Sequence, residues 1–137
     1  NRYNRYEDKI KMLNNDIKKA YIDTTSNKKL TKKYDAFSKE LATTIKGASS
    51  LIDDILKGKQ LDDITIYYIK TANIRDTVLF KKGKAMIDSI EFMDETGNKL
   101  GKEETEKKRQ ELYDALEIAI RDIYMSIEEA SAYGFNT

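Results

Sequence analysis

Apolar residues recur every three or four positions along this chain, and no proline interrupts them. In the first half the spacing runs through Tyr3, Tyr6, Ile10, Leu13, Ile17 and Ala20, and then through Leu30, Tyr34, Phe37, Leu41, Ile45, Ala48, Ile52 and Ile55. Such spacing places a narrow apolar stripe on one face of a helix, and another helix must cover that stripe. The chain is therefore predicted to be a helical bundle whose outer faces carry its function.

Turn-forming residues divide this pattern into segments. The polar cluster 23–27 and the loop 94–101 compete with helix for backbone hydrogen bonds, and Gly58 is suited to end a helix. Helices are predicted over residues 2–22, 28–57, 61–93 and 102–134. The third has the stripe Ile64, Tyr68, Ala72, Leu79, Met86, Ile90 and Met93. The stretch 64–69 alone could form a strand, but the helical period continues for about twenty residues beyond it, which favours helix.

Short connections between long helices favour antiparallel neighbours. The predicted fold is therefore all-α, an antiparallel up-down-up-down four-helix bundle, in a single domain over residues 1–137. This topology places the first and third connections at one end of the bundle.

Composition excludes several kinds of site. Cysteine and histidine are both absent, so no disulfide, thiolate zinc site or histidine general base is possible. The serines have no histidine base, and adjacent acids on a helix do not form a paired carboxylate site, so we expect no enzyme, metal or cofactor. The 25 basic and 24 acidic residues nearly cancel, so no strong net field favours nucleic acid or a membrane surface.

Basic residues gather at the end that holds the first and third connections. They include Lys28, Lys29, Lys32, Lys33, Lys107, Lys108 and Arg109. This cluster is either an ordinary solvated helix face or a docking surface for an acidic partner. Three tyrosines off the apolar stripes, Tyr21, Tyr67 and Tyr124, are further candidates for contact with a partner.

Short motifs are scattered over most of the chain. They are NRYNRY at 1–6, KLT at 29–31 followed by Tyr34, IKTAN at 69–73, IDSIE at 87–91, YDA at 113–115 and SIEE at 126–129. Together they resemble the C-terminal domain of the fibronectin-binding surface lipoproteins of Borrelia spirochaetes. The OspE/F-related surface lipoproteins are an alternative family.

The resemblance implies a function and a location. It implies a non-catalytic four-helix domain, excised from a longer lipoprotein precursor and held on the bacterial outer surface by an upstream lipidated segment. Such a domain inhibits the classical complement pathway by binding the proteases C1r and/or C1s. Fibronectin binding would belong to the upstream segment.

Two positions depart from the family pattern. The basic residues that dominate protease binding in the family fall on Phe37 and Asp114 here, so their role is not carried over. Neighbouring cations could replace them. The predicted partner-binding residues are Lys28, Lys29, Lys32, Lys33, Lys39, Lys107, Lys108, Arg109 and Arg121.

Two other functions fit the same sequence. The lysines could bind a matrix protein or a glycosaminoglycan, as in an adhesin, or the helices could form a purely structural bundle. A monomer is expected, although narrow stripes can also pair between chains.

Overall fold

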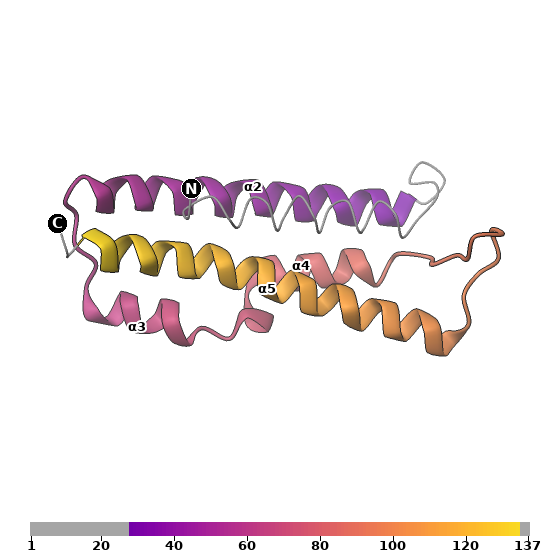
Figure 1. Cartoon of the computed structure of the whole chain (residues 1–137). Helices are drawn as coiled ribbons and strands as arrows, with labels where there is room; N and C mark the ends of the chain where they lie inside the picture. The colour runs from indigo at the N-terminus through magenta and orange to yellow at the C-terminus, as the bar shows by residue number, and fades with distance from the viewer. Residues whose placement is uncertain (1–27, 135–137) are drawn as a thin grey trace.

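The structure is a computed structural model that describes the backbone of residues 28–134, so the predicted helix over 2–22 lies outside the described residues. The elements are α2 (Lys28–Leu56), α3 (Asp63–Thr71), the short 3₁₀ helix η2 (Ile74–Asp76), α4 (Val78–Ile87) and α5 (Lys102–Gly134) (Figure 1). Within this part of the chain there is no strand, only an isolated bridge between Met93 and Lys99. The all-α prediction is confirmed for these residues.

The two long helices agree closely with the sequence prediction. The end of α2 has the hydrogen bonds of a left-handed glycine cap: Gly58, at φ 113°, donates to Ile55, and Lys59 donates to Asp54. At the start of α5, Glu103 and Glu104 stand in the first turn, where carboxylates complement the helix dipole. The segment 102–111 is helical even though it contains no apolar residue.

The single helix predicted over 61–93 is wrong. The chain breaks after Thr71, and α3 and α4 are separate helices joined through η2. Side chains cause the break: Asn73 Oδ1 accepts a hydrogen bond from the Arg75 backbone N–H, and the Thr77 hydroxyl accepts one from Phe80 and caps α4. Beyond α4, residues 88–101 form a longer connection than predicted.

The break also changes which side chains are buried. The prediction placed Ile64 and Tyr68 on a core stripe, but they are 82% and 59% exposed. The rest of that stripe is buried apart from Met93, which is half-buried. The two exposed side chains belong to α3, which is turned differently from a straight continuation of α4.

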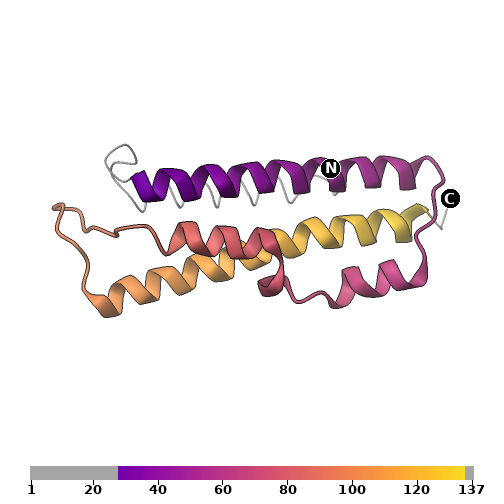
Figure 2. The ribbon, with the colours of Figure 1, turned by 180° about the vertical axis from the view of Figure 1, so that it is seen from behind.

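The described helices lie along a common direction. α2 and α5 run one way, and α3 and α4 run the opposite way (Figures 1 and 2). α2 packs against α4 and α5, whereas α3 packs against α5. The buried core between them includes Leu30, Phe37, Leu41, Ile52, Ile55, Leu79, Phe80, Met86, Leu116, Ile120 and Ile123.

Gly83 lets three helices come together closely. It lies buried in α4, and a Cβ added there would be 2.5 Å from Leu116 Cδ2 of α5 and 3.0 Å from Phe37 Cε1 of α2. Both neighbours are fully buried, so neither can swing away without disturbing the core. The sequence reads Lys81-Lys82-Gly83-Lys84, and the structure shows that this glycine is a packing residue.

A pair of substitutions tests this role. Gly83→Ala should lower the free energy of unfolding by about 1–3 kcal/mol, because the core is overpacked. Gly47→Ala, in the exposed middle of α2 with no neighbour within 4 Å, should raise it by up to about 1 kcal/mol, because alanine favours helix. Urea denaturation followed by circular dichroism measures both. A stabilising Gly83→Ala would contradict the close approach.

Candidate functional site

The first two turns of α2 carry four lysines. Lys28, Lys29, Lys32 and Lys33 are all exposed, and the first turn of α2 contains no acidic residue. None of the four makes an ion pair with a carboxylate within residues 28–134. Cations at a helix N-terminus are unfavourable because they face the positive end of the helix dipole. Lys28 and Lys29, which lie in the first turn, therefore stand where they weaken the helix.

The first turns of α5 lie at the same end of the molecule. Figure 1 shows this end with the connection 88–101 projecting beyond it, while α4 lies between α2 and a later part of α5. Lys107 and Lys108 are exposed here. Acids are interleaved with them, since Glu103 and Glu106 line the same shallow depression as Lys107. The positive charge is thus stronger on α2 than on α5.

Lys39 lies on α2 six residues after Lys33, and it too is exposed. The next residue, Glu40, forms an ion pair with Lys82 of α4, with 3.7 Å between Oε1 and Nζ. The exposed basic surface of this end consists of Lys28, Lys29, Lys32, Lys33 and Lys39 on α2, which we call the α2 basic surface. Lys107 and Lys108 lie on α5, whose first turns are at the same end of the molecule.

Arg109 is turned toward the protein rather than toward solvent. Its Nη2 lies 3.5 Å from the backbone oxygen of Asp88, and its buried Nε has no hydrogen-bond partner among the described residues. Asp88 ends α4, where the Tyr113 hydroxyl donates to Oδ1 and Lys84 Nζ donates to Oδ2 at 2.8 Å. Lys84 Nζ also lies 5.1 Å from the Tyr113 ring centroid. The group links α4 to α5.

These contacts change the acidity of both groups. Burial acts to raise the pKa of Asp88, but the hydrogen bonds from Lys84 and Tyr113 outweigh it, and the pKa is lowered below its ordinary value. Burial, together with the hydrogen bond to Asp88, raises the pKa of Tyr113 well above its ordinary value. Asp88 is therefore an ionised acceptor and Tyr113 a neutral donor near neutral pH.

Arg121 also makes an internal contact. Its Nη2 donates at 2.8 Å to the backbone oxygen of Ala72, which ends α3, and the side chain is half-buried. Unpaired carbonyls at a helix end need such a donor. The assignment of Arg109 and Arg121 to a binding surface stays a prediction, and the structure gives each a bond that holds two elements together.

The two positions highlighted by the family resemblance have different surroundings. Phe37 is 1% exposed in the core and is closed to any partner. Asp114 is exposed and accepts a hydrogen bond at 2.9 Å from Nη2 of Arg75. The Nε of the same arginine donates to Glu117 at 2.5 Å. Arg75 was missed by the sequence reasoning. It belongs to η2, so no spacing along one helix could have indicated that it reaches α5.

Other kinds of site find no support in the described part of the chain. Within residues 28–134 no group of three or more carboxylates is placed to hold a metal ion. No helix described there is long and apolar enough to cross a bilayer. Comparisons with protein-family models, with curated proteins and with solved structures gave no match to this chain. Inference about function therefore starts from these side chains.

The Asp88 group has a testable pH dependence. A lowered pKa in the folded state means that ionised Asp88 contributes stability above its unfolded pKa of about 3.9, and that this contribution is lost as the pH falls through the lower folded value. Relative to Asp88→Asn, the wild-type protein should be more stable at neutral pH, and this advantage should shrink below about pH 4. Denaturation across this pH range measures it.

Tyr113→Phe serves as the companion variant. It keeps the buried ring and removes the donor, so the pKa of Asp88 in the folded state should lie closer to its unfolded value. In the Tyr113→Phe background, the stability lost on Asp88→Asn should therefore be smaller, and its decline on acidification should be complete at a higher pH. A pH-independent difference between wild type and Asp88→Asn would contradict the assignment.

The unfavourable position of the α2 lysines gives a second test. Replacing Lys28 and Lys29 by Glu should raise the free energy of unfolding by about 0.3–1 kcal/mol each at low salt. Lys46→Glu, an exposed change in the middle of α2, should have an effect near zero. Thermal melts compare the three variants, and a gain from Lys46→Glu equal to the other two would remove the dipole explanation.

Proposed function

We propose that this chain is a non-catalytic binding domain that docks on an acidic protein surface through the α2 basic surface. The observation that carries the proposal is the group of exposed lysines on the first two turns of α2, which lack ion-pair partners among the described residues. Lys28 and Lys29, in the first turn, oppose the helix dipole, so a favourable interaction with the dipole does not account for their presence. Carboxylates of a partner would pair with these lysines, and this attraction would favour binding.

The partner we propose is C1r and/or C1s of the classical complement pathway. Support comes from the resemblance of the short motifs to the complement-inhibitory domain of the Borrelia fibronectin-binding lipoproteins. Inhibition would be steric, with the rigid helices covering the protease or its substrate-docking surface. No catalytic step is needed, and the lysines act by speeding encounter and selecting the partner.

The same proposal includes the arrangement and location of the domain. The predicted helix over 2–22 would complete an antiparallel up-down-up-down four-helix bundle with α2, the α3–α4 pair and α5. The domain would be held on the bacterial outer surface by a lipidated segment upstream of residue 1, and fibronectin binding would reside in that segment. A dilute domain would bind its protease as a monomer.

Surface plasmon resonance against purified C1r and C1s tests the proposal. A dissociation constant below about 10 μM for at least one of them is expected, and weaker binding to both rejects it. Replacing Lys28, Lys29, Lys32 and Lys33 together by Glu should weaken binding by at least about tenfold, because the charge complementarity is reversed.

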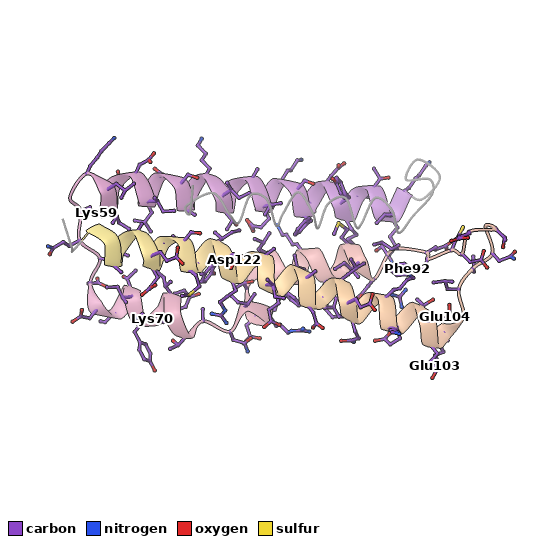
Figure 3. All side chains as sticks on the ribbon, in the orientation of Figure 1. Lys59, Lys70, Phe92, Glu103, Glu104 and Asp122 are labelled. Carbon is purple, nitrogen blue, oxygen red and sulfur yellow. The ribbon has the colours of Figure 1, made fainter. Side chains whose placement is uncertain are left out.

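A matched control changes four other exposed lysines to Glu. These are Lys46, Lys57, Lys59 and Lys81. Lys59 stands at the end of the molecule opposite Glu103 and Glu104 (Figure 3). Both quadruple variants have the same net charge, so any difference between them reports position and not the overall field. Equal losses would remove the α2 basic surface from the proposal.

Retention on heparin that collapses at moderate salt, without protease binding, would favour the adhesin function instead.

A further inference from the structure

The outer face of α3 carries exposed apolar side chains. Three of the six large apolar side chains that are exposed in the described part of the chain belong to this nine-residue helix. Ile64 is 82% exposed, Tyr67 70% and Tyr68 59%. Their spacing of three and four residues puts them on one face. Tyrosine and isoleucine gathered in this way are typical of a surface that contacts another protein.

The opposite side of α3 is already in use. Ile69 is buried against the core, and among the described helices α3 packs against α5. Tyr68 lies at the edge of this contact, with its ring centroid 6.5 Å from that of Tyr124 of α5. α3 stands at the outside of the molecule in both ribbon views (Figures 1 and 2). The face formed by Ile64, Tyr67 and Tyr68, which we call the α3 outer face, is therefore open to a partner.

Charges at the two ends of α3 suggest which partner fits. Asp63 begins the helix and Lys70 stands in its last turn. Seven residues correspond to nearly two full turns, so both lie along the same edge of the helix, about 10 Å apart along its axis. The α3 outer face thus has a negative charge at one end of this edge and a positive charge at the other.

We propose that the α3 outer face binds the α3 outer face of a second copy of this chain, in an antiparallel contact with two-fold symmetry. A two-fold axis perpendicular to the helix near Tyr67 brings the same edge of both copies together and reverses their direction. Asp63 then lies within about 1.5 Å, along the axis, of the level of the second copy's residue 70. The same pairing repeats on the other side of the axis, while the Ile64 and Tyr67 side chains of both copies meet between them.

The internal contacts of these charges leave room for such pairing. Lys70 Nζ lies 3.5 Å from Glu128 Oε1, and its side chain is 54% exposed. An ammonium group has three N–H donors, so it can bind a second carboxylate. A standard interface takes about 20–30 residues from each partner, whereas α3 has nine residues in all. We therefore expect a monomer below about 10 μM and a growing dimer population toward about 1 mM.

Sedimentation equilibrium over this concentration range tests the proposal. The average mass should rise from 15.8 kDa toward twice that value as the concentration increases. Asp63→Lys and Lys70→Asp should each weaken dimerisation by at least about tenfold, because each places like charges opposite one another. The double variant D63K/K70D should restore dimerisation, because the opposite charges meet again with exchanged positions.

The double variant separates pairing from damage to the fold. It carries the local penalties of both single changes, namely a cation in the first turn of α3 and an acid beside Glu128. Recovery therefore reports the contact across the axis. Tyr67→Ser is a second variant, since the side chain is mostly exposed and its loss should abolish the dimer without changing the circular dichroism spectrum.

Three results would overturn the proposal. The first is a constant mass of 15.8 kDa up to about 1 mM. The second is a double variant that dimerises no better than the single ones. The third is loss of C1r or C1s binding in Tyr67→Ser while the unaltered chain stays monomeric, which would assign this face to the protease. Protease binding that survives Tyr67→Ser leaves the function of the α2 basic surface intact whether or not the dimer forms.

Discussion

The burial of the apolar stripe of α5 holds the described structure together. Each of the other described elements packs against this one helix, namely α2, α3, η2 and α4. For α3, the contact with α5 is the main one among the described elements. Leu116, Ile120 and Ile123 of the stripe are each 1% exposed. Gly83 contributes to the same contact, because the absence of a Cβ lets α4 pack closely against Leu116 of α5 and Phe37 of α2. This apolar centre holds the α2 basic surface in position.

Sequence periodicity was sufficient for the long helices and misleading for the third. α2 and α5 begin at the predicted residues. The left-handed Gly58 marks the end of α2, and the acids Glu103 and Glu104 mark the first turn of α5. In the third segment Ala72 and Leu79 are seven residues apart, which is two helical turns, so the apolar stripe appeared continuous across the break. Asn73 and Thr77 lie between them and cap the following elements with their side chains. Such competition is visible in residue type, but period alone does not reveal it.

The candidate site was predictable to a different degree. The lysines at the start of α2 could be placed from the helix boundary and the expected topology, because lysine side chains are rarely buried. The arginines could not be placed in this way. Arg109, Arg121 and Arg75 each bond to a group more than twenty residues away along the chain, and such contacts depend on how two helices are aligned in space. An arginine counted as part of a charged surface can instead fasten the fold.

The attachment of α3 has a consequence for motion in the folded protein. Among the described helices α3 packs mainly against α5, and it exposes the side chains of Ile64, Tyr67 and Tyr68. The hydrogen bond from Arg121 to Ala72 and the ion pair between Lys70 and Glu128 are two of its polar contacts with α5. Local opening needs little free energy where few buried contacts must be broken. The amide protons of α3 should therefore exchange with deuterated solvent well before those in the centres of α2 and α5, through excursions in which this short helix detaches while the rest of the fold stays closed.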